Sequence, residues 1–253
     1  MTRHLEGTVA LVTGASSGIG EATAVALAAE GATLAIAARR RDRLEQVVER
    51  IGSDADVLVV ETDITDEAAA RAMVEATVLE FGRLDTVINN AGVMLLGPIV
   101  GAPVEEWRRM VELNVLGLLY TTHAALPHLL AAAEQEPRRV ADIVNVSSVA
   151  GRFARLGSGV YNTTKFGVGA FSESLRQEVT RRHVRVSLIE PGATRTELAG
   201  HNRPEVLQTM AATFGDTELM QAEDIAESIV FTVTRPRHVA VNEVLIRPTE
   251  QER

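Results

Sequence analysis

Tyr161 and Lys165 are the two residues whose types and spacing best suit proton transfer. They lie four apart in a stretch of helical periodicity, so their side chains share one face of a helix. A free tyrosine titrates near pH 10, whereas a neighbouring ammonium favours the phenolate and lowers the pKa of the phenol. The pair predicts a phenol that acts as acid or base, although a single Tyr-x3-Lys pair is more often exposed on a helix surface.

Polar residues end two predicted strands and interrupt one apolar helix. The strand ends are 89–92, Asn-Asn-Ala-Gly, and 145–148, Asn-Val-Ser-Ser, and both lie at the carboxyl edge where parallel sheets bind ligands. Asn114 lies in an apolar setting, where its amide needs a hydrogen-bond partner. A structural role competes with a functional one for Asn114, and loop fixing competes with cofactor contact for Asn89 and Asn90.

A turn rich in glycine follows the first predicted strand and has the sequence Thr13-Gly14-Ala15-Ser16-Ser17-Gly18-Ile19-Gly20. Glycine permits a tight turn and lets backbone N–H groups approach a pyrophosphate at a helix N-terminus. The spacing Gly-x3-Gly-x-Gly differs from the common dinucleotide fingerprint, so that rule applies by analogy. A turn that needs glycine for packing alone is the competing interpretation.

Arg39 and Arg40 follow the second predicted strand and indicate which dinucleotide is bound. An NAD site places an acid there to hold the ribose 2′-hydroxyl, but no acid occurs before Asp42. A guanidinium pairs with a 2′-phosphate that a carboxylate would repel, and Ser16 or Ser17 is positioned to add a hydroxyl. The pattern favours NADP(H). Arg41 and Arg43 are expected only to begin a solvated helix.

Short apolar runs alternate with longer segments of helical period along the chain. Apolar strands separated by helices indicate a parallel sheet covered on both faces, so we predict a single-domain α/β chain, 1–253, with a doubly wound, seven-stranded Rossmann fold. The predicted strands are 8–13, 33–38, 56–61, 85–89, 140–146, 184–190 and 241–246, and the predicted helices are 18–30, 41–51, 66–81, 104–133, 158–182 and 222–234.

Two segments depart from this alternation. The polar stretch 131–139 connects a helix to a strand and is predicted to be a surface loop. The stretch 193–220 follows the sixth strand, and its apolar residues keep no clear period. Long excursions at the carboxyl end of a strand commonly carry function, so a substrate lid is predicted there.

Composition excludes several classes of function. The net charge of −9 argues against a nucleic-acid partner, and the absence of cysteine excludes thiol catalysis and disulfides. His123 and His128 are five apart with no completing carboxylate, so no metal site is predicted. The first residues lack the apolar run of a signal peptide, and no apolar stretch approaches the roughly 20 residues needed to span a bilayer, which predicts a cytoplasmic protein without membrane contact.

Taken in order, these motifs resemble those of the short-chain dehydrogenase/reductase family over essentially the whole chain. Ser148 precedes Tyr161 by the family's usual thirteen positions, which favours it over Ser147. Each motif is moderately specific and the ordered set is very specific. The set consists of Thr13-Gly14-x3-Gly18-x-Gly20, Asn89-Asn90-Ala91-Gly92, Asn114, Ser148, Tyr161-x3-Lys165 and Pro191-Gly192.

The resemblance implies a role for each catalytic residue. Tyr161 would be the general acid in reduction and the base in oxidation. Lys165 would lower its pKa and bind the nicotinamide ribose, Ser148 would hold the substrate oxygen, and Asn114 would support a water that relays protons. Asp63 would contact adenine, with helix N-capping as the competing reading. The implied cofactor-binding residues are Gly14, Ser16, Ser17, Gly18, Ile19, Gly20, Arg39, Arg40, Asp63, Asn90, Ala91, Gly92, Tyr161, Lys165, Pro191, Gly192, Thr194 and Thr196.

The resulting hypothesis is an NADPH-dependent carbonyl reductase or alcohol dehydrogenase that acts on a small molecule. Segments such as 93–98 and 171–178 resemble the clavulanate dehydrogenase branch of the family, although 131–139 is longer here. One alternative is an NADP-dependent 3-hydroxy-acid dehydrogenase, with Arg152 or Arg155 binding a carboxylate; another is a non-catalytic dinucleotide sensor. Helices 107–130 and 161–179 are apolar over much of their surface, and the family often pairs them in tetramers, so a homo-oligomer, tetramer or dimer, is expected.

Overall fold

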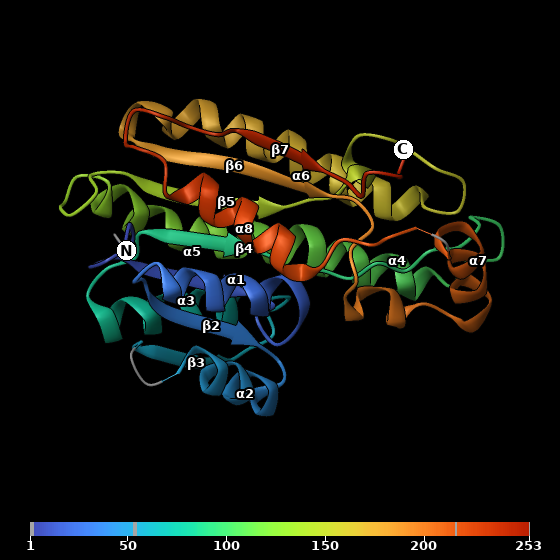
Figure 1. The fold of residues 1–253 in the computed structure, drawn as a ribbon, viewed down its shortest axis with the longest axis horizontal. Coiled ribbons are helices and arrows are strands. Elements are labelled where there is room, and N and C mark those ends of the chain that lie inside the picture. Colours follow the sequence, from blue (N-terminus) through green and yellow to red (C-terminus); the bar gives the residue numbers. More distant parts are fainter. Residues whose placement is uncertain (1–2, 53–54, 216, 253) are drawn as a thin grey trace.

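The computed structural model describes residues 3–52, 55–215 and 217–252, and its centre is a seven-stranded parallel sheet (Figure 1). The strand order is β3-β2-β1-β4-β5-β6-β7, so the direction of winding reverses between β1 and β4. The predicted doubly wound sheet is confirmed, with strand ends shifted by at most two residues. The strands are β1 (Val9–Thr13), β2 (Thr33–Ala38), β3 (Val57–Glu61), β4 (Thr86–Asn89), β5 (Ala141–Val146), β6 (Val184–Pro191) and β7 (Glu243–Ile246).

Helices cover both faces of this sheet. α1 (Gly18–Ala29), α2 (Arg41–Ile51) and α8 (Ala222–Val233) pack on one face, and α3 (Glu67–Phe81), α5 (Leu118–Ala132) and α6 (Gly159–Val179) pack on the other. Alternate residues of one strand face the two helix layers. Val12 belongs to the hydrophobic core on the side of α1, and Leu11 belongs to the core on the side of α5. This two-sided burial is the reason that the strands read as continuous apolar runs.

The predicted helix 104–133 is one continuous helix whose middle part is π-helical. It consists of α4 (Val104–Val111), a π-helical stretch η1 (Glu112–Gly117) and α5, and Asn114 lies within the π-helical part. Gly117 packs closely against the loop that precedes α3. A β-carbon added to Gly117 would lie 2.9 Å from Ile64 Cγ1. Insertions of this kind occur often at functional sites, and hydrophobic period does not reveal them.

By length and composition alone, the continuous helix Val104–Ala132 is apolar enough to cross a membrane, which corrects the expectation that no stretch of the chain is. In the fold it covers the sheet: Leu118, Ala125 and Leu129 are buried, and α5 packs against α3, β4 and β5. Much of its apolar surface is therefore core surface.

The two irregular segments have different outcomes. Residues 134–137 are exposed, as predicted for a surface loop, although Ala132 and Ala133 before them are buried. Segment 193–220 contains structure that the sequence reading missed, namely the 3-10 helix η4 (Glu197–His201) and the helix α7 (Pro204–Phe214). Pro204 at the first helical position was the available signal. α7 lies beyond the carboxyl ends of the strands (Figure 1); residue 216 lies outside the described ranges.

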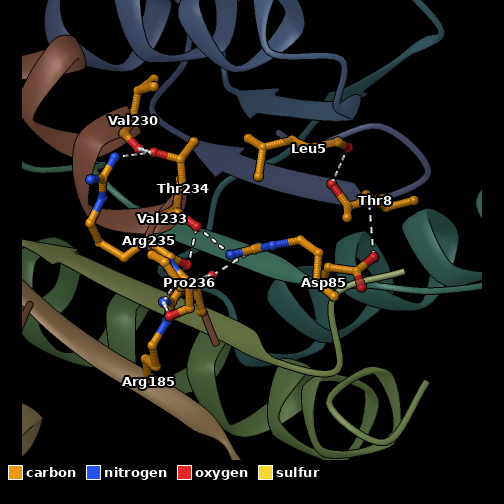
Figure 2. Close-up of polar contacts among 12 residues, drawn as sticks. Leu5, Thr8, Asp85, Arg185, Val230, Val233, Thr234, Arg235 and Pro236 are labelled. Atoms are coloured by element: carbon orange, nitrogen blue, oxygen red, sulfur yellow. Dashed lines mark hydrogen bonds and ion pairs between the residues drawn. The ribbon is translucent and has the colours of Figure 1, made fainter. Parts of the chain in front are cut away.

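A buried ionic cluster closes the opposite, amino edge of the sheet (Figure 2). Asp142 on β5 and Arg185 on β6 are partners in register and form two hydrogen bonds of 2.7 and 2.9 Å. The same guanidinium donates to the carbonyls of Val233, Arg235 and Val239 at 2.8–3.0 Å, where the chain leaves α8. This clamp joins the last helix to the middle of the sheet.

Candidate active site

A cavity of about 930 Å³ opens at the carboxyl ends of β1, β2, β4, β5 and β6, and residues from 92–96, 149–165 and the segment after β6 complete its wall. Its size and position match those of ligand sites in doubly wound sheets. All the predicted site residues line it except Gly20 and Asn114, which lie behind the wall. The structure therefore gathers one site from residues that are far apart in the sequence.

The glycines of the first turn serve both packing and access. Gly14 and Gly18 have φ values of +65° and +58°, a region that favours glycine. A β-carbon on Gly14 would lie 2.7 Å from Ala91 Cα, and one on Gly20 would lie 2.3 Å from Gly14 O. Gly20 is thus a packing residue, whereas Gly14 and Gly18 also face the cavity.

Asn89 is the last residue of β4 and Asn90 follows it, and the side-chain amides of both join neighbouring elements. Asn90 donates from Nδ2 to Thr13 O and Gly14 O at 3.0 and 3.1 Å, and it also lines the cavity. Asn89 is buried and donates to Asn145 Oδ1 and Thr122 Oγ1. The loop-fixing interpretation therefore describes Asn90, whereas Asn89 joins β4 to β5 and α5.

Arg40 lies at the far end of the cavity, at the turn between β2 and α2. Its Nη2 donates to Ser16 Oγ at 3.1 Å, Ser17 Oγ at 3.0 Å and Glu197 Oε2 at 2.9 Å. Arg39 Nη1 lies 3.9 Å from Asp63 Oδ2. The sequence predicted the arginines and the serines, but it gave no reason to expect Glu197, which comes from the segment after β6.

Asp63 lines the cavity but does not cap α3. Its Oδ1 accepts from Thr65 N and Thr65 Oγ1 at 3.1 and 2.8 Å, which closes a local turn. Asp66 is the N-cap and accepts from Ala69 N at 3.0 Å. The competing N-cap reading of Asp63 is therefore wrong.

Tyr161 and Lys165 lie on α6 as predicted, both are buried, and both line the cavity. Lys165 Nζ lies 5.9 Å from the centre of the Tyr161 ring and donates to Val146 O at 2.9 Å. Burial raises the pKa of Tyr161 to about 12, while a hydrogen bond with Ser148 lowers it, and burial lowers the pKa of Lys165 to about 8. The expected depression of the phenol pKa by the ammonium is wrong for this structure, because burial raises this pKa by more than the hydrogen bond with Ser148 lowers it.

Lys165 is the only lysine of the chain, and its burial should cost stability at neutral pH. Its pKa is about 8 in the fold and ordinarily 10.5, so the unfolded chain binds more protons between these values and stability rises with pH there. We expect Lys165→Met to raise the free energy of unfolding by about 2 kcal/mol at pH 7, after the loss of the bond to Val146 is counted. Urea unfolding from pH 7 to 10.5 should show this gain shrinking as pH rises; a constant gain would contradict the assigned pKa.

Ser148 rather than Ser147 faces the reacting centre. Ser148 Oγ accepts from Ala150 N at 3.1 Å, and this serine forms a hydrogen bond with the Tyr161 phenol. Ser147 is buried and donates to Lys165 O at 3.2 Å, which is a helix-anchoring contact. The geometry agrees with the choice of Ser148.

Asn114 has its amide bonded on both sides. Oδ1 accepts from Val93 N at 2.7 Å, and Nδ2 donates to Val93 O at 2.8 Å and to Thr164 Oγ1 at 3.2 Å. A β-carbon at Gly92 would lie 3.3 Å from this Oδ1 and 3.8 Å from Lys165 Nζ. Asn114 is thus a core amide with satisfied hydrogen bonds, and it lies just behind Lys165.

The wall after β6 is fixed by bonds within its own segment and from the C-terminal end. Thr194 Oγ1 donates to Gly192 O at 3.1 Å, and Thr196 Oγ1 accepts from Leu198 N at the start of η4. Ala193 N donates to Gln251 Oε1 at 2.8 Å, and Gln251 also lines the cavity. Sequence reasoning missed Gln251, since it lies 58 positions away and belongs to no motif.

Arg152 does not face a ligand as a free cation. It donates to both carboxylate oxygens of the buried Glu190 at 2.7 Å and also bonds Glu243. The Arg152 side chain is 38% exposed, and its ion pairs occupy the group that would hold a substrate carboxylate. Arg155 is exposed and lines the cavity.

Comparison with known proteins places this arrangement in a family. Residues 8–207 match the model of the short chain dehydrogenase family. The chain is 36% identical over 246 residues to an uncharacterized oxidoreductase of Staphylococcus saprophyticus, covering 96% of each protein. It is 39% identical over 249 residues to the glycine betaine reductase ATRR of Emericella nidulans, but spans only 19% of that protein and 98% of itself.

A solved structure gives the same result. The closed form of a serine dehydrogenase complexed with NADP+ superposes with a TM-score of 0.87 at 30% identity, covering 97% of each chain. The chain therefore belongs to the short-chain dehydrogenase/reductase family. It is an oxidoreductase that interconverts CH–OH and C=O groups with a nicotinamide dinucleotide.

Proposed function

We propose that the protein is an NADP(H)-dependent reductase of aldehydes or ketones that also catalyses the reverse alcohol oxidation. The observation that carries this proposal is the composition of a single cavity. Tyr161, Lys165 and Ser148 line one end of it, and Arg40 with Ser16 and Ser17 lines the other. A phenol that transfers protons and a cationic site for phosphate are the two parts that such a reaction needs.

The residues of the cavity fit NADP(H). Arg39, Arg40, Ser16 and Ser17 offer donors for a 2′-phosphate, and no acid follows β2 before Asp42. The pyrophosphate would lie at the turn of Gly14–Gly20 and the start of α1, and Pro191, Gly192, Thr194 and Thr196 would hold the nicotinamide end. The bound cofactor supplies or accepts hydride. The serine dehydrogenase with the same fold is complexed with NADP+, which supports the choice over NAD.

The chain's own residues move the proton. A pKa near 12 keeps the Tyr161 phenol protonated at neutral pH, which suits donation of its proton to a carbonyl oxygen. Ser148, bonded to the same phenol, would hold that oxygen. Asn114 fixes the loop at Val93 and so positions Gly92 beside Lys165; its support of a proton-relaying water stays a prediction.

The substrate end of the cavity is largely apolar. Its wall includes Met94, Leu96, Phe153, Leu156, Leu207 and Met210, the last two from α7. We propose that segment 193–220 is a lid and that the substrate is apolar or amphipathic. A clavulanate-type aldehyde is one such compound, and the branch resemblance in the sequence is its support.

A second candidate is a 3-hydroxy-acid dehydrogenase. Within the described part of the chain, the side chain of Arg155 forms no ion pair or hydrogen bond, although it lines the cavity, so it is available for a carboxylate. Serine, the substrate in the name of the similar structure, carries such a group. A dinucleotide sensor without turnover is less well supported, because a sensor does not need a buried Tyr-Lys pair.

Two further proposals concern assembly and location. The exposed Val111 and Phe166 lie on the two helical segments predicted to pair, which supports a homo-oligomer, dimer or tetramer. A cytoplasmic location is proposed from the absence of cysteine and the family resemblance.

The function is tested by following NADPH and NADH oxidation with a panel of aldehydes, ketones and β-keto acids. We expect turnover of apolar carbonyls with NADPH and at least about tenfold lower kcat/KM with NADH, since a lost charge-assisted phosphate contact is worth more than 1.4 kcal/mol. Preference for β-keto acids that Arg155→Ala removes would favour the hydroxy-acid reading. NADPH binding without turnover of any member would favour the sensor.

A further inference from the structure

Arg40 forms hydrogen bonds with two walls of the cavity. Its Nη2 contacts Ser16 and Ser17 of the turn after β1, and it contacts Glu197 of the lid segment at 2.9 Å. Residues 40 and 197 are 157 positions apart, so only the fold brings them together. The Glu197 carboxylate thus bonds the same Arg40 Nη2 atom that bonds the two serines.

Glu197 is held at the start of η4, which lies directly over the glycine turn. Thr196 is the N-cap of η4, and a β-carbon added to Gly18 would lie 3.2 Å from Thr196 Cβ and Cγ2. Glu197 therefore extends from a point of close contact between the lid segment and the cofactor turn. Movement of its side chain away from Arg40 would loosen that contact.

Glu197 is itself an anion, and it lies at the position that we propose for the 2′-phosphate of the cofactor. Hydrogen bonds from Arg40 and then Ser17 lower the pKa of its carboxyl, and Arg43 adds to this effect. The other arginine, Arg39, has Asp63 at 3.9 Å. Both cationic groups at this end of the cavity are therefore already paired with carboxylates of the chain.

We propose that Glu197 is a specificity-determining residue that competes with the 2′-phosphate of NADP(H) for Arg40, so that phosphate binding releases the start of the lid. The proposal rests on the proposed NADP(H) function. A phosphate dianion beside Glu197 would be repelled, whereas a 2′-hydroxyl leaves the Arg40–Glu197 pair intact. The pair is replaceable because its two side chains are 45% and 48% exposed, and exposed ion pairs contribute little.

The test uses two ligands that differ only in the 2′-phosphate, adenosine 2′,5′-bisphosphate and 5′-AMP, with calorimetric binding constants and no turnover. We expect Glu197→Gln to bind the bisphosphate about three- to fivefold more tightly and AMP unchanged, from the size of an exposed charge pair. The matched control is Glu45→Gln, which removes the same charge from an exposed pair with Arg41 on α2. This control should change neither constant.

The binding constants of these variants distinguish a failure of the NADP(H) proposal from a failure of the role of Glu197. If wild type binds both ligands equally and Arg40→Ala changes neither, the NADP(H) proposal fails. If Arg40→Ala weakens only the bisphosphate but Glu197→Gln does not strengthen it, or strengthens AMP equally, the role of Glu197 fails alone. In the double variant Arg40→Ala with Glu197→Gln, the second substitution should not change the binding constant of the bisphosphate further, because Arg40 is no longer there to pair with residue 197.

Hydrogen exchange of the lid supplies a readout that affinity does not. With saturating bisphosphate, amides in 196–202 should exchange faster than with saturating AMP, because Glu197 is released. Glu197→Gln should show the faster exchange with either ligand. Equal exchange with both ligands in wild type would overturn the release of the lid.

Discussion

Tyr161→Phe should lower kcat for NADPH-dependent carbonyl reduction by at least about a hundredfold, the range in which general acid catalysis contributes. The change removes one hydroxyl from a buried ring that packs in an apolar cluster with Val93, Leu95 and Met110. Phenylalanine fills nearly the same volume, so the fold should be retained. NADPH should still bind, because the groups that we propose for its phosphates lie at the other end of the cavity.

The second tyrosine of the chain supplies the control for this variant. Tyr120 lies on α5, is partly buried and does not line the cavity, so Tyr120→Phe makes the same chemical change outside the site. Steady-state rates and NADPH fluorescence titrations should be measured for both variants. Full turnover in Tyr161→Phe, or an equal loss in Tyr120→Phe, would refute the acid–base assignment.

The raised pKa of the phenol also sets the pH dependence of the two directions. Because burial raises this pKa to about 12, the acid form persists across the neutral range and reduction should lose no activity from Tyr161 between pH 6 and 9. Alcohol oxidation needs the phenolate, and its rate should rise with pH over the same interval. The Tyr161→Phe variant should lack this rise.

The sheet and most of the site could be predicted because both follow from local patterns. Strands such as β2, Thr33–Ala38, are apolar on both faces and lie between helical periods, which indicates a covered parallel sheet. In such a sheet the carboxyl ends of the strands meet at one edge. Asn90, Ser148 and Gly192 were therefore expected together although they lie up to 102 positions apart.

The features that were missed depend on tertiary packing. Glu197 and Gln251 reach the cavity from the lid segment and the C-terminal end, and neither stands in a motif or a period. The direction of the Tyr161 pKa was wrong because spacing reports the neighbouring charge but not the loss of water around the ring. The π-helical turn at Asn114 keeps an apolar pattern that also suits a regular helix.

Arg185→Met should lower the free energy of unfolding by about 3 kcal/mol, typical of losing one partner of a buried ion pair. Arg185 is 6% exposed and Asp142 is 1% exposed. Asp142 keeps Arg138 at 3.1 Å, so the charge is not left alone. The carbonyls of Arg235 and Val239 lose this donor, however, whereas that of Val233 keeps a bond from Arg138, and these carbonyls lie where the chain leaves α8. Figure 2 shows Val233 and Arg235 beside Arg185.

Urea unfolding monitored by circular dichroism would measure this loss. Arg182→Met is the matched control, because Arg182 bonds Glu134 at the surface with both side chains more than half exposed. We expect its effect to stay below about 0.5 kcal/mol. A loss of the same size in both variants would show that the burial of Arg185 adds nothing to the free energy of unfolding.

The double variant Arg185→Met with Asp142→Leu, measured beside Asp142→Leu alone, separates the ion pair from the carbonyl clamp. The single variant is needed because Asp142 also bonds Arg138 at 3.1 Å. If the buried pair alone carried the effect, replacing both members with apolar side chains would restore much of the stability, since paired charges pay a desolvation cost. If the clamp carries it, the double variant should remain about as unstable as Arg185→Met, because unsatisfied carbonyls stay at the end of α8. We expect the second outcome, since Arg185 donates to more carbonyl groups than carboxylates.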